Sequence, residues 1–429
     1  MMEKIYRQFL KSKEVFIDSR ETCKGGLFFA LKGENADGNK FAGEAIEKGA
    51  AMAIIDDPEY KSPDPRTVLV ENSLETLQEL AAMYRKEFRI PFIAVTGSNG
   101  KTTTKELMGA VLERKYTACT SKGNLNNHIG VPLSILSMKK DTEIAVIEMG
   151  ANHVGEIKKL CEIARPTHGL ITNIGKAHLE GFLDLEGVMR AKSELYHFLM
   201  DNKGDIFVNR DDELLMDLSA EAGRYTYGND DHADVCTRLI DEDPFLTVQW
   251  KTPAGEFLIE SRLYGRYNYP NIQAAIAVGH YFHVNPHDIA HGIRHYIPEN
   301  SRSQIIETGN NKVLLDAYNA NPTSMEFALD YMDRLRDTPK AYILGDMLEL
   351  GNTSGMEHRN ILKKLNETGA THVMLVGSEF TKAAQKTRFL SFQNSGEARD
   401  WLREHPLKGF TILVKGSRKI QLEQVLKEL

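Results

Sequence analysis

The stretch PFIAVTGSNGKTTTKEL, residues 91–107, begins as an apolar run typical of a buried β-strand and continues as a glycine-flanked polar loop. Gly97 and Gly100 flank two residues, and Lys101 and Thr102 follow them. The amides of such a loop, together with the N-terminus of a following helix, favour anions. Lys101 can reach terminal phosphate oxygens, and the Thr102 hydroxyl can ligate Mg²⁺. The stretch therefore predicts a phosphate-binding loop between a strand and a helix.

This loop departs from the general pattern G-x-x-x-x-G-K-[ST], because Val95 stands where that pattern has its first glycine. It also lacks the third glycine of a dinucleotide-binding fingerprint. Two alternatives stay open: a helix cap that binds no phosphate, and a guanine-nucleotide switch. The switch would use NKGD at 202–205, which fits N-K-x-D. Because that tetrapeptide lies between a helical pattern and a strand, we expect a turn there instead.

The composition excludes several classes of protein. At 429 residues, the chain is long enough for two or three domains. Its net charge of -7 provides no basic field for nucleic acid. No apolar stretch reaches the roughly 18 residues of a membrane span, and the charged N-terminus has no signal-peptide core. We therefore expect a cytoplasmic protein with no nucleic-acid partner and no membrane span.

The cysteines give no sign of a cross-linked or metal-bound framework. They are Cys23, Cys119, Cys161 and Cys236, and no two of them form a C-x-x-C pair. We therefore expect neither disulfides nor a zinc site, in keeping with a reducing compartment.

Apolar runs alternate with helical patterns and fall into three regions. Residues 1–90 contain EVFIDS, LFFAL and AMAIID, followed by the helical pattern SLETLQELAAMYRKEF. Residues 91–298 contain FIAVTG, IAVIEMG, HGLITNIG and DIFVNR, and residues 299–429 contain KVLLDAYN, KAYILGDM, HVMLVG and FTILVKG. This alternation is typical of βαβ units, so we expect an α/β protein of three domains with a mostly parallel central sheet.

Polar side chains follow the predicted strands of the central region. Glu148 ends the run IAVIE, and Asn173 and His178 follow the run HGLIT. Because parallel strands bind ligands at their carboxyl ends, we expect Glu148 and His178 to face the phosphate loop and contact a metal or phosphate. A helix-capping role for Glu148 and a structural role for His178 are the alternatives.

Lys192 lies in a helical pattern with apolar neighbours. A surface ion pair with Glu186 or Glu194 is the ordinary interpretation of such a lysine. Burial for a functional purpose is the alternative, although holding a lysine neutral at pH 7 costs roughly 4–5 kcal/mol. The spacing alone leaves both interpretations open.

Six spaced motifs occur in order over nearly the whole chain: TGSNGKTTT, IEMG, NIGKAHLEGF, AKSE, GRYNYPNIQAA and DAYNANPTSM. Together they resemble the Mur ligases, the ATP-dependent amide-forming enzymes of peptidoglycan precursor synthesis. The resemblance implies a P-loop ATPase domain between an N-terminal α/β uridine-nucleotide-binding domain and a C-terminal Rossmann-like α/β domain. YNANPTSM and GDMLELG are similar to the family's last ligase, which joins D-alanyl-D-alanine to a UDP-N-acetylmuramoyl tripeptide. The sequence has no D-N-P-R-like segment, which the preceding ligase would carry.

The resemblance implies a nucleotide site with two Mg²⁺ ions. The residues implied to bind ATP are Gly97, Ser98, Asn99, Gly100, Lys101, Thr102, Thr103, Asn268, Asn271, Arg302 and Asp316. Thr102 would ligate one Mg²⁺, and Glu148 and His178 would ligate the second. Lys192 matches a lysine that this family carbamylates with CO₂, which makes it an anion able to orient a metal. Lys101, Glu148, His178 and Lys192 are thus implied to converge on one catalytic cavity.

The resemblance also implies where the other substrates bind. Ser19 and Arg20 match a uridine platform. Further implied substrate-binding residues are Asn126, Asn127, His128, Tyr318, Asn319, Asn321, Lys415 and Ser417. The implied partners are UDP-N-acetylmuramoyl-tripeptide and D-alanyl-D-alanine, and we expect a monomer. Whether the third peptide residue is meso-diaminopimelate or lysine stays open.

Two positions depart from the family pattern. The family's DGH is DGN here, with Asn39, which puts one uridine-side contact in doubt. Leu315 replaces the first acid of a pair before the tyrosine, which weakens the nucleotide assignment at Asp316. The implied reaction proceeds through an acyl phosphate. The alternatives are another Mur-type ligase or a folylpolyglutamate synthase-like enzyme and, from a different class, a nucleotide-dependent switch or binding module.

Overall fold

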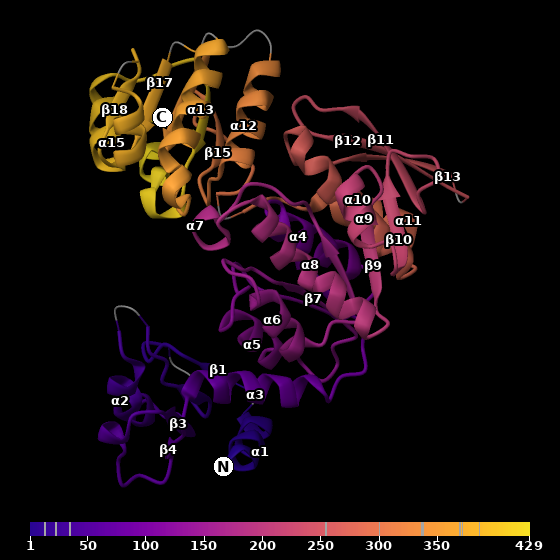
Figure 1. Cartoon of the computed structure of the whole chain (residues 1–429), viewed down its shortest axis with the longest axis vertical. Coiled ribbons are helices and arrows are strands. Elements are labelled where there is room, and N and C mark those ends of the chain that lie inside the picture. Colours follow the sequence, from indigo (N-terminus) through magenta and orange to yellow (C-terminus); the bar gives the residue numbers. More distant parts are fainter. Residues whose placement is uncertain are drawn as a thin grey trace.

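The computed structural model describes residues 1–12, 14–21, 24–33, 36–253, 255–299, 301–335, 339–368, 370, 372–385 and 387–429. Within them, the strands form separate sheets of four, nine and six strands in chain order. Figure 1 shows the corresponding N-terminal, central and C-terminal units, with both outer units against the central one and apart from each other. The predicted three-domain α/β class is confirmed, while the exact boundaries at residues 90 and 298 stay predictions.

The N-terminal unit is built on a parallel sheet in the order β1-β2-β3-β4. Its helices and strands are α1 (Met2–Ser12), β1 (Val15–Phe16), β2 (Leu27–Phe29), α2 (Ala42–Glu47), β3 (Met52–Ile55), β4 (Thr67–Leu69) and α3 (Ser73–Arg85). Short 3-10 turns lie at η1 (Gly38–Phe41) and η2 (Pro58–Tyr60). The predicted strands and helix are present, but the strands are shorter than the apolar runs that indicated them.

The central unit is a sheet in the order β13-β12-β11-β10-β9-β8-β5-β7-β6. Its strands are β5 (Phe92–Thr96), β6 (Ala118–Thr120), β7 (Ile144–Glu148), β8 (His168–Ile171), β9 (Asp205–Asn209), β10 (Gly223–Gly228), β11 (Val235–Asp241), β12 (Thr247–Thr252) and β13 (Gly255–Glu260). Its helices are α4 (Lys101–Leu112), α5 (Gly130–Leu136), α6 (Glu156–Ala164), α7 (Leu179–Phe182), α8 (Leu185–Asp201), α9 (Glu213–Leu218), η3 (Arg266–Asn268), α10 (Tyr269–Tyr281) and α11 (Pro286–His295).

The seven strands β5 to β11 of this sheet pair in parallel with their neighbours, as predicted. By contrast, β12 pairs antiparallel with both β11 and β13. The sequence interpretation misses this antiparallel extension. A sequence signal for these strands is the alternation of residues in β12, where Val248 and Trp250 are buried between less buried neighbours.

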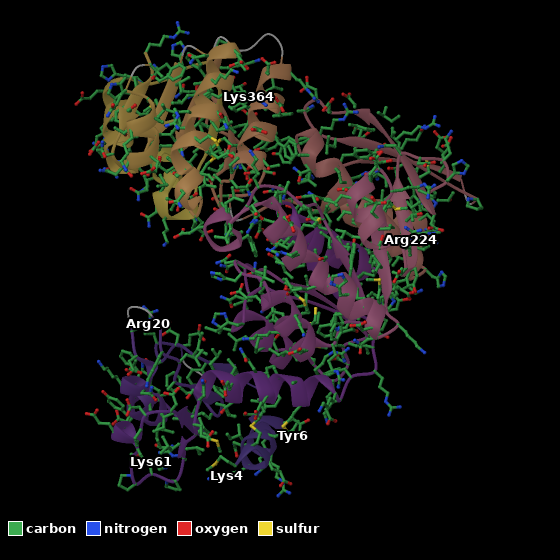
Figure 2. All side chains as sticks on the ribbon, viewed as in Figure 1. Lys4, Tyr6, Arg20, Lys61, Arg224 and Lys364 are labelled. Carbon is green, nitrogen blue, oxygen red and sulfur yellow. The ribbon has the colours of Figure 1, made fainter. Side chains whose placement is uncertain are left out.

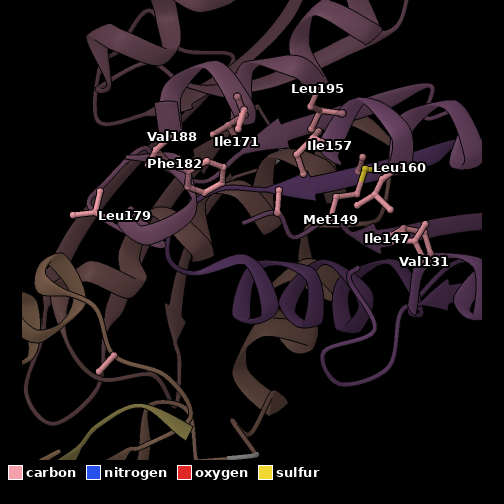
Figure 3. Close-up of a cluster of buried hydrophobic side chains, with 14 of the residues drawn as sticks. Val131, Ile147, Met149, Ile157, Leu160, Ile171, Leu179, Phe182, Val188 and Leu195 are labelled. Carbon is pink, nitrogen blue, oxygen red and sulfur yellow. The ribbon is translucent and has the colours of Figure 1, made fainter. Parts of the chain in front are cut away.

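The parallel part of the sheet is covered on both faces. Alternate residues of β5 enter different cores, because Phe92 and Ala94 join the core of α6 and α8, and Ile93 and Val95 join that of α4 and α10. Figure 3 shows the first core, in which side chains of β7, α6 and α8 meet. With both faces apolar, ligand-binding groups of this sheet gather at the strand ends.

The C-terminal unit is a sheet in the order β14-β15-β19-β16-β17-β18, in which only β14 runs antiparallel to its neighbour among the described strands. Its strands are β14 (Gln304–Glu307), β15 (Lys312–Asp316), β16 (Lys340–Gly345), β17 (His372–Val376), β18 (Leu390–Phe392) and β19 (Thr411–Lys415). Its helices are α12 (Pro322–Arg334), η4 (Gly351–Thr353), α13 (Ser354–Glu367), α14 (Ser378–Ala383), α15 (Ser395–Glu404), η5 (Arg418–Ile420) and η6 (Leu422–Glu428).

Several smaller predictions can be compared with the structure. The NKGD segment forms the turn between α8 and β9, as predicted. Cys119, Cys161 and Cys236 are free thiols, and Cys23 lies outside the described residues. In the described part of the chain, no helix has both the length and the apolar character that a bilayer crossing requires.

Arg85, at the end of α3, ties the N-terminal unit to the central one. Its buried guanidinium donates to the carbonyls of Ala164 (2.7 Å), Phe88 (2.8 Å) and Arg165 (3.1 Å). It also lies 4.3 Å from the centroid of the Phe92 ring, at the start of β5. Loss of this side chain would leave three carbonyls without a charged donor.

Arg85→Met should therefore lower the free energy of unfolding by about 3 kcal/mol, measured by urea denaturation. Arg89→Met changes an exposed position nearby and is the matched control. The free energy of unfolding of this control should stay within about 0.5 kcal/mol of the wild-type value. Equal losses in the two variants would contradict the role given to Arg85.

Candidate functional site

A cleft of about 370 Å³ lies where the central unit meets the C-terminal unit. Its walls come from the phosphate loop, the segments after β6, β7 and β8, the start of α10 and the segment after β15. The sequence-predicted residues that line it are Ser98, Asn99, Gly100, Lys101, Thr102, Thr103, Asn126, Asn127, His128, Glu148, His178, Asn268, Asn271, Arg302, Asp316, Tyr318, Asn319, Asn321 and Lys415. Residues from widely separated motifs thus share one cavity.

Five predicted residues do not line this cleft: Gly97, Lys192, Ser417, Ser19 and Arg20. Gly97 belongs to the phosphate loop itself. Lys192 is buried behind Ala151, which lines the cleft, and Ser417 is buried against Ala320, which lies between the lining residues Asn319 and Asn321. Ser19 and Arg20 lie in the N-terminal unit, and Figure 2 shows Arg20 on the edge of that unit that faces the C-terminal unit.

The phosphate loop requires glycine at two positions. Gly97 and Gly100 have φ values of 139° and 81°, which strain any other residue. A Cβ on Gly97 would lie 2.0 Å from Thr172 Oγ1, and one on Gly100 would lie 2.6 Å from Asn271 Oδ1. Gly100 is also the N-cap of α4, so the first turn of that helix presents its unpaired amides at the cleft.

The loop is held by neighbours from two units. The Asn99 amide donates to Asn173 Oδ1 (3.1 Å), and the Thr172 hydroxyl donates to the Asn99 carbonyl (2.6 Å). From the C-terminal unit, Asn321 Nδ2 donates to Asn99 Oδ1 (2.8 Å). The position of the loop therefore depends on the contact between the central and C-terminal units.

Lys101 lies at the mouth of the loop. Its Nζ donates to the carbonyls of Gly97 (2.7 Å) and Ser98 (3.1 Å). Burial lowers the pKa of Lys101, and the Arg302 charge adds to this, whereas the Glu148 carboxylate opposes it.

Glu148 ends β7 and points into the cleft with 1% of its surface exposed. Asn126 Nδ2 donates to its Oε1 (2.7 Å), and its Oε2 has no hydrogen-bond partner. The proposed helix-capping alternative is wrong, because the carboxylate that caps α6 belongs to Glu194, which accepts from the Gly155 and Lys158 amides.

His178 joins the central unit to the C-terminal unit. It has a positive φ of 52° and precedes α7. Its Nδ1 lies 2.5 Å from Glu349 Oε2, and this contact with His178 lowers the pKa of Glu349. Nearby, Lys176 Nζ donates to the buried Glu357 carboxylate (2.9 Å). The imidazole thus faces the cleft while one of its nitrogens is held from across the junction.

Lys192 is buried on α8, with 1% of its surface exposed. Its Nζ donates to the carbonyl of Ala151 (3.3 Å), which lines the cleft, and lies 5.2 Å from the centroid of the Phe182 ring. Burial, and next the Lys101 charge, lower the pKa of Lys192 to about 7. The surface ion-pair interpretation of this lysine is therefore wrong.

A chain of amides fastens α4 to α10. The Thr104 hydroxyl donates to Asn271 Oδ1 (3.0 Å), and Asn271 Nδ2 donates to Asn268 Oδ1 (2.9 Å). Asn268 Nδ2 in turn donates to the Tyr264 carbonyl and to Ser303 Oγ. Both asparagines line the cleft, but their side chains already form these hydrogen bonds within the protein. Each can therefore offer a ligand only the donors and acceptors that these bonds leave free.

Charged residues of the C-terminal unit line the side of the cleft opposite the phosphate loop. The Arg302 guanidinium lies 3.5 Å from the centroid of the Tyr318 ring. Lys415 Nζ forms an ion pair with Asp316. The Ser417 hydroxyl accepts from the Leu348 amide (2.9 Å), so Ser417 supports this side without facing the cleft.

The sequence-based prediction did not single out several residues of this region, among them Tyr267, Phe327 and Glu349. The first two line the cleft with their rings stacked 6.1 Å apart. Tyr267 lies inside the motif GRYNYPNIQAA, so its signal was available. Glu349 lies inside GDMLELG, so its signal was available in the same way. Phe327 comes close to the central unit only through folding, which no local pattern reveals.

The N-terminal residues form local contacts. The Ser19 hydroxyl donates to Glu44 Oε2 (3.4 Å), and Arg20 is exposed and pairs with Asp18. The departing residue Asn39 is buried and its side-chain amide donates to two aspartates. In this chain, position 39 therefore fastens a turn of the N-terminal unit.

The residues present fit a hard cation that is completed by phosphate oxygens. Among the described residues, no group of three or more His, Cys, Asp or Glu side chains could hold a metal by itself. Glu148 Oε2 and Thr102 Oγ1 are, however, buried oxygens without hydrogen-bond partners. Mg²⁺ is commonly bound by one or two protein oxygens together with substrate phosphates.

Comparison with known proteins gives consistent similarities over the whole chain. Family models match in order: "Mur ligase family, catalytic domain" at residues 11–85, "Mur ligase middle domain" at 95–279, and "Mur ligase, glutamate ligase domain" at 301–418. The UDP-N-acetylmuramoyl-tripeptide–D-alanyl-D-alanine ligase of Bacillus subtilis is 35% identical over 97% of this chain and 92% of its own length.

Solved structures agree. A crystal structure of MurF from Acinetobacter baumannii is 30% identical, covers 100% of this chain and 97% of its own, and has a TM-score of 0.88. The MurF ligase from Thermotoga maritima in complex with ADP is 27% identical, covers 98% and 97% of the two chains, and has a TM-score of 0.84.

Gly97→Ala should lower the free energy of unfolding by about 3 kcal/mol, because it adds a steric clash with Thr172 to the strain of a positive φ. Gly155→Ala is the matched control, since its φ is 92° but a Cβ there meets nothing within 4 Å. The control should lose only about 1–2 kcal/mol, the cost of the backbone strain. Equal losses in chemical denaturation would show that the loop is not packed as described.

Proposed function

This chain belongs to the Mur ligase family, and from that premise we propose that it joins D-alanyl-D-alanine to UDP-N-acetylmuramoyl-tripeptide, consuming ATP and forming ADP. The observation that carries the proposal is the cleft, which gathers a phosphate loop, a carboxylate oxygen without a hydrogen-bond partner and polar side chains from two units. The enzyme would act as a monomer in the cytoplasm, on a nucleotide-linked precursor of peptidoglycan.

The reaction must make a carboxylate electrophilic. The γ-phosphoryl group of ATP would pass to the terminal carboxylate of the tripeptide, which gives ADP and an acyl phosphate. The amine of D-alanyl-D-alanine would then attack the carbonyl carbon and lose a proton. The tetrahedral intermediate would expel inorganic phosphate and leave the amide. Such transfers depend mainly on positioning and on neutralising charge.

The phosphate loop would hold the triphosphate. The amides of residues 97–103 and the N-terminus of α4 would contact its oxygens, and Lys101 would turn from its loop carbonyls to the γ-phosphate. Asn268 and Asn271 would face the adenine side, with Arg302 and Asp316 reaching the nucleotide from the C-terminal unit.

Two Mg²⁺ ions would neutralise the charge that develops during phosphoryl transfer. Thr102 would hold one ion through its hydroxyl, and Glu148 and His178 would hold the other. Support for the assignment of Thr102 and Glu148 is that Thr102 Oγ1 and Glu148 Oε2 are buried oxygens without a hydrogen-bond partner. His178 would keep its orientation through Glu349.

Lys192 would carry a carbamate formed with CO₂. A carbamate forms from the neutral amine, and a pKa of about 7 makes the neutral amine available near neutral pH. The carbamate anion would lie beside the Ala151 carbonyl and close to Lys101, and it would help to orient the second Mg²⁺.

The remaining predicted residues would bind the two other substrates. Ser19 and Arg20 would contact the uridine nucleotide, and the segment 126–128 would contact the muramoyl peptide. The residues assigned to the C-terminal side of the peptide site are Tyr318, Asn319, Asn321, Lys415 and Ser417. Of these, Ser417 would act by holding the segment at Leu348.

Phosphate release from ATP should require both UDP-N-acetylmuramoyl-tripeptide and D-alanyl-D-alanine, because the acyl phosphate must form and then be consumed. Both the meso-diaminopimelate and the lysine forms of the tripeptide should be assayed. Hydroxylamine added without the dipeptide should trap the activated carboxylate as a hydroxamate. Phosphate release that ignores either substrate, or a failure to trap the hydroxamate, would contradict the proposal.

Lys192→Ala should lower turnover at least about a hundredfold, since it removes a group that would orient a metal. Small carboxylates such as acetate should restore part of the activity. The wild type equilibrated with ¹³CO₂ should show a carbamate signal by ¹³C NMR that the variant lacks. Lys159→Ala, at an exposed position on α6, is the control and should retain both signal and activity. Full activity of the Lys192 variant would remove the carbamate from the mechanism.

A further inference from the structure

Lys105 is a buried lysine that the proposed reaction does not use. It follows Lys101 by one turn of α4, and only 1% of its surface is exposed. It does not line the cleft. Burying an ammonium group is costly unless it is well paired, so this position calls for a physical reason.

The Lys105 ammonium group is bonded to the segment that follows β6. Its Nζ donates to the carbonyls of Ser121 (2.8 Å) and Gly123 (3.1 Å). This segment continues into Asn126, Asn127 and His128, which line the cleft. Lys105 therefore ties the helix of the phosphate loop to a neighbouring wall of the same cavity.

The same ammonium group lies beside the carboxylate that faces the cleft. Glu148 Oε2 is 3.8 Å from Lys105 Nζ, and both side chains are 1% exposed. The Glu148 amide donates to Ser121 Oγ (3.0 Å), and Asn126 Nδ2 donates to Glu148 Oε1 (2.7 Å). The Gly150 amide donates to the Asn126 carbonyl (2.7 Å). The segment is thus fastened to α4 on one side and to the end of β7 on the other.

We propose that Lys105 is a positioning residue that holds the segment 121–128 in the place where it binds the peptide part of the nucleotide-linked substrate. This inference rests on the proposed function. Lys105 touches neither nucleotide nor peptide, and it acts through the carbonyls of Ser121 and Gly123. Removal of the Lys105 side chain should therefore weaken the binding of the nucleotide-linked peptide and leave the binding of the other two substrates unchanged.

Lys105→Met keeps most of the side-chain volume and removes the charged donor. The KM for UDP-N-acetylmuramoyl-tripeptide should rise roughly tenfold or more, the effect of losing one charged hydrogen bond. The KM values for ATP and D-alanyl-D-alanine should stay within about twofold, since the phosphate loop is held by other contacts. Amide hydrogen exchange should accelerate in residues 121–128 and stay unchanged in the phosphate loop.

Lys115→Met is the matched control. Lys115 lies just beyond the other end of α4, and its Nζ likewise donates to two carbonyls, those of Phe282 (3.2 Å) and His283 (2.9 Å). These carbonyls are away from the cleft, so all three KM values should match the wild type. Lys105→Arg, which keeps charged donors, should recover part of the tripeptide affinity.

A parallel rise in all three KM values, or unchanged exchange in residues 121–128, would overturn the proposal. If Lys105→Met does not fold, Lys105→Gln should be measured in its place with the same expected selectivity. If the wild-type enzyme fails the two-substrate assay, the proposed function fails. Even then, amide hydrogen exchange in the Lys105 and Lys115 variants still decides whether Lys105 anchors residues 121–128.

Discussion

The close approach of the carboxyl ends of β7, β5 and β8 is the constraint on which the site depends. These strands are neighbours in the parallel sheet, and they end at Glu148, Thr96 and Ile171. Both faces of the sheet are filled by apolar cores, so the polar residues that follow each strand meet at one edge. The phosphate loop can pack there only because Gly97 leaves room for Thr172 after β8. Changes to this packing would therefore disturb the loop before they disturb any ligand.

The C-terminal unit completes this edge through a few polar contacts. Asn321 reaches the phosphate loop at Asn99, and Glu349 reaches His178. The Glu180 amide also donates to the Glu349 carbonyl (3.0 Å), so the contact involves main chain as well as side chain. Aromatic contacts add to these polar ones, because the rings of Tyr267 and Phe327 stack across the same junction with their centroids 6.1 Å apart. The place of the C-terminal unit over the cleft therefore depends on polar and aromatic contacts together.

Features of the fold and the site could be predicted from the sequence where they depend on residues close together in the chain, and not where they depend on residues far apart. The strand before the phosphate loop and the place of Glu148 at a strand end are encoded by local periodicity, and the structure has both. The burial of Lys192 was open between two interpretations, because helical spacing does not say which face a helix covers. The contact between Glu349 and His178 joins residues far apart in the chain, and the antiparallel strands β11–β13 interrupt an otherwise regular βαβ rhythm. Neither follows from a local pattern.

The distribution of lysines explains how an acidic chain can present an anion site. The net charge is -7, so long-range attraction of a phosphate is weak. Among the described residues, the buried lysines are Lys105, Lys192 and Lys415, each 1% exposed, and all three adjoin the cleft that Lys101 lines. A buried cation acts in a medium of low dielectric, so its field at a few ångströms is much stronger than that of a surface lysine. Lys192 does not add to this field in the proposed mechanism, because burial lowers its pKa to about 7 and its carbamate would be an anion. Lys105 and Lys415 are balanced by Glu148 and Asp316, which makes their burial tolerable before a ligand binds. The positive potential of the site is therefore local and built into its walls.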